Sequence, residues 1–136
     1  MIVVDVNIVA YLLLGGPKAS EAEEVLLADS EWHAPLLWRS QLRNVVAGFL
    51  RRGALNIEGA DEVLAASEVL FFDHEHLVDS SDVLRGIARS TCSAYDCEYV
   101  ALAETLGAIL VTEDRQLLAE FPSLARSMKS FLAAGP

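Results

Sequence analysis

Three aspartates of this chain stand where a parallel α/β sheet would bring them together. Asp5 directly follows the apolar run 2–4. Asp114 comes three residues after the apolar run 108–111, and Asp96 falls in the first turn of an expected helix. Because ligands of such sheets bind beyond the carboxyl ends of the strands, all three side chains can point into one crevice.

Three neighbouring carboxylates repel one another in a partly desolvated site, and a bound divalent cation or a shared proton relieves this repulsion. Hard oxygen ligands without His or Cys favour Mg²⁺ or Mn²⁺ over zinc or copper, and leave coordination positions open for a phosphate. The set therefore suits hydrolysis of a phosphodiester bond. The alternative is that the acids only cap helices, because Asp96 and Asp114 both stand where the helix dipole favours an acid.

The elements that would position these side chains follow from the hydrophobic pattern. Apolar runs without alternation predict strands buried on both faces at residues 2–4, 32–34, 69–72 and 108–111, with a short final strand near 127–131. Helices are predicted over 6–14, 18–29, 35–52, 57–67, 79–89, 94–106 and after Asp114. This alternation predicts a three-layer α/β/α domain around a parallel sheet of about four or five strands.

Length and composition favour one globular domain spanning residues 1–136. The chain has 136 residues, of which 53% are hydrophobic, so it can bury a core that offsets its ordering entropy. No apolar run approaches the roughly 18 to 20 residues of a membrane-spanning helix, and no signal-peptide pattern opens the chain. We therefore expect a soluble, cytoplasmic protein that has no membrane partner.

The charge balance limits how a nucleic acid could be bound. Twenty acidic residues against ten basic ones give a formal charge of -10, which argues against binding driven by the phosphate backbone alone. Four arginines gather on the central helix, and Arg39 and Arg43 could line an entrance for RNA beside the acidic crevice. Ordinary solvated helix surface is the alternative. Cys92 and Cys97 fit neither a disulfide framework nor a zinc spacing, and we interpret them as reduced packing residues.

Four segments of the chain resemble the PIN-domain family, in particular the VapC-type toxins of bacterial and archaeal toxin–antitoxin pairs. In order, they are IVVDVN at 2–7, LWRSQLRNV at 37–45, YDCEYVALA at 95–103 and LVTED at 110–114. The resemblance covers nearly the whole chain. It implies a Mg²⁺-dependent (or Mn²⁺-dependent) endoribonuclease with Asp5, Asp96 and Asp114 as metal ligands, and with Asn7 and Thr112 as polar supports.

The same resemblance implies partners. VapC-like toxins commonly form homodimers, cleave RNA, and are bound by a cognate antitoxin that lays a C-terminal segment, often carrying an arginine, across the active site.

One position departs from the family pattern. Where the family usually has Glu, three residues before the Asn of the central helix, this chain has Gln41. A glutamine oxygen can still ligate a cation or hold a metal-bound water, but it cannot act as a base. The change is consistent with a weakened enzyme, a site with one firmly held ion, a relative kept for binding, or an engineered substitution. A catalytically weakened binding module for an antitoxin or an RNA-associated partner is therefore the second functional hypothesis.

Two other interpretations have less support. A receiver-type phosphoacceptor also gathers acids around Mg²⁺, but it needs an acidic pair after the first strand and a late lysine, and the chain has no lysine between Lys18 and Lys129. His74-Glu75-His76 could form a metal-binding pair, but it lacks a third nitrogen or sulfur ligand in the sequence. We interpret these histidines as solvated turn residues.

Overall fold

A five-stranded parallel sheet organises the chain in the computed structural model, which describes residues 1–135. The strands are β1 (Ile2–Val4), β2 (Trp32–Pro35), β3 (Glu75–His76), β4 (Ile109–Val111) and β5 (Ala125–Arg126), in the spatial order β3-β2-β1-β4-β5. The chain builds outward from β1 to β2 and β3, then returns to place β4 on the other side of β1. The strand order thus reverses between β1 and β4, where a crevice is expected at the carboxyl ends.

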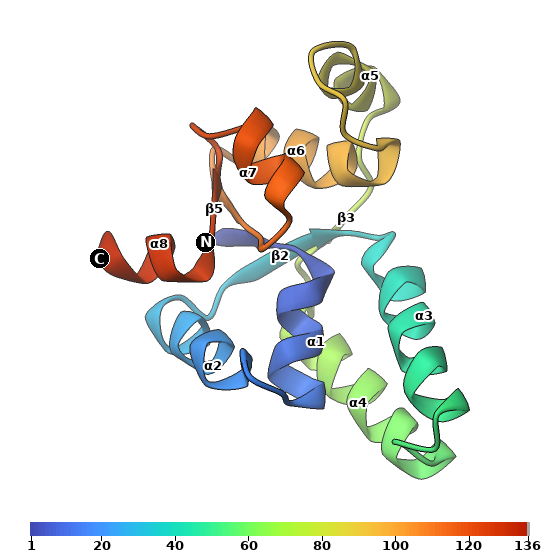
Figure 1. The fold of residues 1–136 in the computed structure, drawn as a ribbon. Helices are drawn as coiled ribbons and strands as arrows, with labels where there is room; N and C mark the ends of the chain where they lie inside the picture. The colour runs from blue at the N-terminus through green and yellow to red at the C-terminus, as the bar shows by residue number, and fades with distance from the viewer. Residues whose placement is uncertain (136) are drawn as a thin grey trace.

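Helices cover both faces of this sheet, as the sequence predicts (Figure 1). On one side lie α1 (Val6–Leu14), α2 (Ala19–Ala28), α3 (Trp38–Arg51) and α4 (Ile57–Leu70); on the other lie α5 (Ser80–Ala88), α6 (Ala94–Leu106) and α7 (Arg115–Glu120). The last helix, α8 (Met128–Ala133), packs against α2 and β5. The three-layer α/β/α prediction is confirmed.

The central strand β1 is buried on both faces. Val3 and Val4 are fully buried, and β1 pairs with β2 on one side and with β4 on the other. The helix α6 contacts β1, β2 and β4 from one side, and α1 leaves β1 on the other. Because neither face meets water, an uninterrupted β-branched run is favoured over an alternating one.

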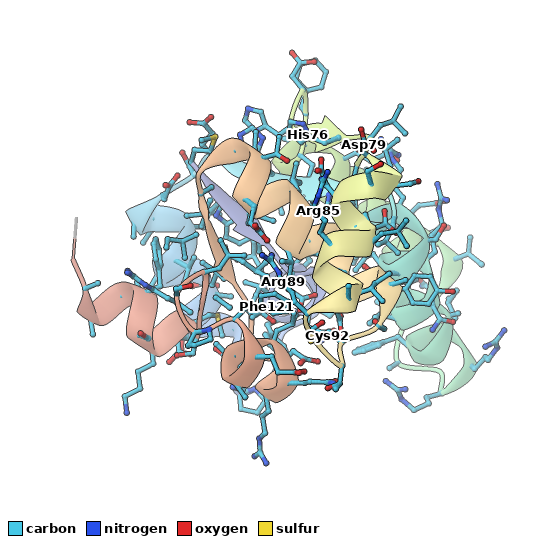
Figure 2. The ribbon with its side chains drawn as sticks, turned by 90° about the horizontal axis from the view of Figure 1, so that it is seen from above. His76, Asp79, Arg85, Arg89, Cys92 and Phe121 are labelled. Atoms are coloured by element: carbon cyan, nitrogen blue, oxygen red, sulfur yellow. The ribbon has the colours of Figure 1, made fainter. Side chains whose placement is uncertain are left out.

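The helix α5 packs closely on α6 and is held at its start by a cap. The carboxylate of Asp79 accepts a hydrogen bond from the backbone N–H of Ser81 at 2.9 Å. A Cβ on Gly86 would lie 3.4 Å from Cys97, an ordinary van der Waals contact, so α5 faces α6 directly at this position. Figure 2 shows Arg85 and Arg89 following one another along α5 toward Cys92, with the Arg89 guanidinium 5.4 Å from the centroid of the Phe121 ring.

The expected strand at 69–72 is wrong, because this segment is the end of α4 and the turn that follows. Asn56 caps α4 by accepting a hydrogen bond from Gly59, and the helix continues to Leu70. Only Phe71 is buried, with its ring 4.6 Å from that of Trp38, whereas Val69 and Phe72 are 76% and 73% exposed. A short apolar run cannot distinguish a strand from a helix end. The strand of this region is the polar pair of β3.

The expected final strand near 127–131 is also wrong. Ser127 accepts a hydrogen bond from the backbone of Ser130 and starts the helix α8. The strand β5 lies just before it and has only two residues, so its pattern is too short to read from sequence. Both cysteines are free and buried, in agreement with the prediction, and burial raises the pKa of Cys92 to about 12. Within residues 1–135, no helix has the length and apolar character that crossing a membrane requires.

Two adjacent phenylalanines test the corrected assignment of this region. Phe71→Ala removes a buried ring from the contact with Trp38 and should lower the free energy of unfolding by about 3–5 kcal/mol. Phe72→Ala, the matched control, should change it by no more than about 0.5 kcal/mol because its ring is exposed. Urea unfolding measures both. Similar losses in the two variants would contradict the assignment, since a buried strand would need both rings.

Candidate active site

The reversal of strand order brings two of the predicted aspartates to one end of the sheet. Asp5 follows β1, and Thr112 and Asp114 follow β4, which is its direct neighbour. The backbone N–H of Asp5 donates a hydrogen bond to the Val111 carbonyl at 3.0 Å, which continues the pairing beyond β1. Two segments separated by about a hundred residues of chain thus meet at the carboxyl ends of β1 and β4.

Asp5 is a buried carboxylate that does not cap its helix. Its side chain is 7% exposed, makes no capping hydrogen bond to α1, and instead accepts a hydrogen bond from Thr112 Oγ1 at 2.7 Å. Burial raises the pKa of Asp5 above its ordinary value, and the charges of Asp96 and Asp114 raise it further. The Thr112 hydrogen bond and the nearby backbone N–H of Asn7 oppose this rise.

The fully buried hydroxyl of Thr112 links two of the aspartates. Thr112 Oγ1 donates to Asp5 and accepts a hydrogen bond from the backbone N–H of Asp114 at 3.0 Å. Asp114 in turn caps α7, because its Oδ1 accepts a hydrogen bond from the Leu117 backbone N–H at 2.9 Å. Capping therefore occupies one oxygen of Asp114 and leaves Oδ2 for another contact. Thr112 fixes where Asp5 and Asp114 stand relative to each other.

Asp96 reaches the same region from α6. It lies in the first turn of this helix, where Ser93 Oγ accepts a hydrogen bond from its backbone N–H at 3.1 Å. Burial raises the pKa of Asp96, the charge of Asp114 raises it further, and the Ser93 hydroxyl opposes the rise. The three aspartates are therefore close enough for their charges to interact in every pair: Asp5 with Asp96, Asp5 with Asp114, and Asp96 with Asp114.

The donor set fits a hard divalent cation that keeps part of its water. All three groups are carboxylates, and their mutual repulsion is what a cation would neutralise. The carboxylate oxygens of the three aspartates do not all lie within 4.8 Å of one another, so they do not form a closed cage. Among residues 1–135, the group that meets this distance is formed by Glu31, His33 and His74. Magnesium tolerates an open set, because it commonly binds through one or two carboxylates and several waters.

Gln41 joins this region through a residue that the sequence analysis missed. The hydroxyl of Tyr99 donates a hydrogen bond to Gln41 Oε1 at 2.8 Å, and the Tyr99 side chain is almost fully buried. Burial raises the pKa of Tyr99 well above its ordinary value, and the charges of Asp5, Glu98 and Asp96 contribute. Tyr99 stands three residues after Asp96, so helical spacing places both on one face and could have identified it.

The remaining predicted side chains differ in their surroundings. The side chain of Asn7 is exposed. Asn7 acts on Asp5 through its backbone N–H, which lowers the pKa of the Asp5 carboxyl. Arg39 forms ion pairs with Glu68 at 2.9 Å and with Glu75 at 2.7 Å, which tie α3 to α4 and β3. Arg43 is exposed one helical turn later, and none of the ion pairs found within residues 1–135 includes it.

Comparison with known proteins gives consistent results. The family profile described as PIN domain matches residues 2–123. Ribonuclease VapC3 of Pyrobaculum aerophilum is 30% identical over 126 residues, which cover 90% of this chain and 96% of the relative. Ribonuclease VapC3 of Mycobacterium tuberculosis is also 30% identical, over 124 residues that cover 90% of this chain and 88% of the relative.

Two solved structures share the fold. The crystal structure of PAE2754 from Pyrobaculum aerophilum superposes with a TM-score of 0.75 at 22% identity, covering 97% of this chain and 93% of the other. A toxin-antitoxin complex from Klebsiella pneumoniae contains a chain with a TM-score of 0.66 at 15% identity, covering 94% of this chain and 98% of the other. At these identities the likeness concerns the fold.

Removing one of the coupled charges should stabilise the protein in the absence of divalent ions. Because the pKa of Asp96 is raised on folding, its contribution to stability is complete below the unfolded pKa and is lost as the pH rises through the folded pKa. Asp96→Asn imitates the neutral acid. In EDTA at pH 7 it should raise the melting temperature, by about 2–4 °C for each kcal/mol of repulsion relieved.

The gain should shrink toward pH 3, where the carboxyl is protonated in both states. Asp61→Asn, on the exposed surface of α4, serves as the control for lost net charge and should shift the melting temperature little. A melting temperature of Asp96→Asn that falls below that of the unchanged protein at pH 7 in EDTA would contradict the proposed repulsion.

Proposed function

The chain belongs to the PIN domain family, among the VapC-type proteins, and we propose that it is a Mg²⁺-dependent endoribonuclease that acts as the toxin of a toxin–antitoxin pair. The relatives that are 30% identical over 90% of this chain carry the name ribonuclease. The observation that carries the proposal is the placement of three carboxylates from separate segments: Thr112 bridges Asp5 and Asp114 at the ends of β1 and β4, and Asp96 opens α6 close enough for its charge to act on Asp5.

In the proposed reaction, the three aspartates hold one or more divalent cations, with Mn²⁺ as an alternative to Mg²⁺. When bound, such a cation acts as a Lewis acid that activates water and stabilises negative charge on the phosphate. Thr112 donates to Oδ2 of Asp5, which opposes the rise that burial causes in the pKa of this carboxyl, and sets its position relative to Asp114. The Tyr99 hydroxyl donates a hydrogen bond to the Gln41 amide oxygen and so orients this amide.

The RNA backbone needs local positive charge, because the whole chain carries a formal charge of -10. Arg43 is the better candidate of the two arginines proposed to contact RNA. The charge of Arg39 is already paired with Glu68 and Glu75, and a phosphate would have to compete with both carboxylates. Screening limits the reach of Arg43 to about 8 Å at physiological salt, so it would act on a phosphate close to α3.

We also propose a cognate antitoxin and a homodimer as partners. A structural neighbour is a toxin-antitoxin complex. An acidic crevice favours a basic antitoxin segment for the same reason that it favours a cation. Free, buried cysteines are consistent with action in the reducing cytoplasm.

The alternative function is a binding module with little catalysis. Gln41 favours this alternative, because it stands where the family usually has a charged carboxylate. A neutral amide lowers the negative charge that would retain a cation. In this case the acidic crevice mainly receives an antitoxin or an RNA-associated partner. Calorimetric titration with Mg²⁺ separates the two functions: no measurable uptake at millimolar metal would favour the binding module.

RNA cleavage tests the proposed enzyme directly. Asp5→Asn keeps the shape of the side chain and an oxygen that can accept the Thr112 hydrogen bond, but removes the charge that would hold a cation. Cleavage of RNA oligonucleotides in Mg²⁺ or Mn²⁺ should fall by about 100-fold or more, equivalent to about 2.7 kcal/mol of transition-state stabilisation. EDTA should have the same effect on the unchanged protein.

The matched control is Asp73→Asn, at an exposed turn where the positive φ of 60° also suits asparagine. This variant should cleave RNA as the unchanged protein does. Equal cleavage by the Asp5→Asn protein, purified in the same way, would exclude Asp5 as a ligand and attribute the activity to a contaminant or another site.

Gln41→Glu should strengthen metal binding. The new carboxylate can accept the same Tyr99 hydrogen bond and adds a fourth negative charge to the region, so we expect Mg²⁺ affinity to rise by about tenfold or more, with faster cleavage. Calorimetry measures the affinity. Ala66→Glu adds the same charge on the exposed surface of α4 and should leave Mg²⁺ binding unchanged. Equal affinities for all three proteins would show that Gln41 does not face the cation.

A further inference from the structure

Three histidines and a glutamate, none of them a residue of the acidic site, gather around β2 and β3. His33 lies within β2 and is 7% exposed; His74 directly precedes β3, and His76 lies in it. Glu31 directly precedes β2. The interpretation of His74 and His76 as solvated turn residues without a third nitrogen ligand is therefore wrong. Both are half-buried, and His33, distant in sequence, supplies the missing nitrogen.

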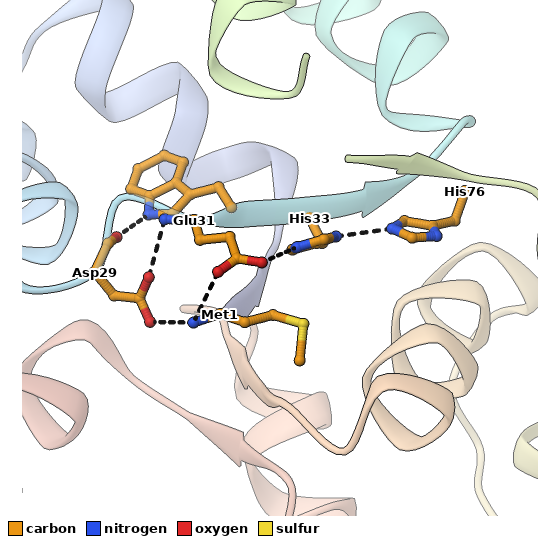
Figure 3. A network of polar contacts seen from close by, with 6 residues as sticks. Met1, Asp29, Glu31, His33 and His76 are labelled. Carbon is orange, nitrogen blue, oxygen red and sulfur yellow. Dashed lines mark hydrogen bonds and ion pairs between the residues drawn. The ribbon is translucent and has the colours of Figure 1, made fainter. Parts of the chain in front are cut away.

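The spacing of three of these side chains fits a metal site. Glu31, His33 and His74 each offer one ligand atom, and these atoms all lie within 4.8 Å of one another. The Nε2 of His33 lies 3.1 Å from Oε1 of Glu31 (Figure 3). Two ligands of a tetrahedral zinc, each about 2.0–2.1 Å from the ion, are about 3.3 Å apart. A small movement of the exposed Glu31 side chain would open this pair to an ion.

The fourth side chain supports the ring of His33 from behind. The Nδ1 of His33 lies 2.8 Å from Nε2 of His76, and Figure 3 shows the two rings in line with Glu31. Without an ion, the Glu31 carboxylate can only accept, so His33 Nε2–H donates to it and His33 Nδ1 accepts from His76 Nε2–H. An ion on His33 Nε2 would reverse the second hydrogen bond, with His33 Nδ1–H donating to His76. Metal-binding histidines commonly donate their other N–H in this way, which fixes the tautomer.

His74 provides an independent observation. Its ring stacks on that of His33, with centroids 4.2 Å apart, and its Nδ1 is buried without a hydrogen-bond partner among residues 1–135. A buried polar atom without a partner costs about 1–3 kcal/mol, so such atoms are rare and call for an explanation. Coordination of a cation by this histidine would provide one.

The surrounding charges permit a cation. The amino group of Met1 lies 3.9 Å from Oε2 of Glu31, but its stronger contact is with Asp29 at 2.6 Å. Glu75, between His74 and His76, pairs with Arg39. Imidazole nitrogens with one carboxylate favour Zn²⁺ and related transition ions over Mg²⁺.

We propose that Glu31, His33 and His74 form a binding site for a transition-metal cation of the Zn²⁺ class, with His76 as a positioning residue and with an open position for water. The ion links the segment before β2, β2 itself and the segment before β3. Since β3 has only two residues and lies at the edge of the sheet, its attachment gains most from such a link.

Titration of the full chain with Zn²⁺ tests this proposal, with calorimetry and the melting temperature as readouts. We expect one ion per chain at this site and a higher melting temperature. His74→Phe preserves the stacked ring without its nitrogens, and Glu31→Gln preserves the size of an exposed side chain. Each should weaken this binding by about tenfold or more. Co²⁺ as a probe should show the absorption of a tetrahedral site in the unchanged protein and should lose it in both of these variants.

The acidic site must be separated in the same experiment. Asp114→Asn should keep the Zn²⁺ ion and its melting-temperature shift, while it weakens Mg²⁺ binding. Mg²⁺ alone should not protect the histidine site. The proposal is overturned if Zn²⁺ binds equally to the His74→Phe and Glu31→Gln proteins, if only Asp114→Asn abolishes binding, or if about 100 µM Zn²⁺ produces neither heat nor a melting-temperature shift. None of these outcomes depends on RNA cleavage.

Discussion

The rest of this region depends on the like-charge repulsion among three aspartates. Asp5 is buried at the end of the central strand, where a charged group is costly, and the charges of Asp96 and Asp114 increase the cost. The fold tolerates the arrangement because one hydroxyl, that of Thr112, bridges Asp5 and the backbone of Asp114. The protein thus holds an electrostatically unfavourable set in place with hydrogen bonds, which is a common property of functional sites.

Capping and metal binding are not exclusive explanations of these acids. Asp114 caps α7 with one oxygen, and the other stays available. Asp5 occupies the position before α1 but makes no capping hydrogen bond; its carboxylate bonds to Thr112, and only the backbone N–H of Asn7 in α1 lies near enough to lower its pKa. The Asp5 carboxylate is therefore directed mainly at Thr112 and less at the N–H groups that open α1, whereas Asp114 caps its own helix.

The histidine cluster and the three aspartates differ in the chemistry of their ligand atoms. Asp5 follows β1, Asp114 precedes α7 and Asp96 lies in the first turn of α6. All three offer only carboxylate oxygen as a ligand. The histidines lie on β2 and beside β3, and they offer imidazole nitrogen with one carboxylate. Different cations are expected at the two places for this reason. Arg39 ties α3 to the histidine side of the sheet, since its two carboxylate partners come from α4 and β3.

The sequence by itself determined the layer architecture and the order of helices and strands near β1, α6 and β4. It also singled out the three aspartates as candidate ligands. Both were possible because buried strands and helix caps leave strong local patterns. It did not determine β3 and β5, which have two residues each and no pattern of their own. Only the tertiary structure decided that Tyr99 binds Gln41, that Arg39 is already paired, and that His33 joins His74 and His76. These contacts join residues far apart along the chain, and their partners are chosen by strand order and helix packing, which no local pattern records.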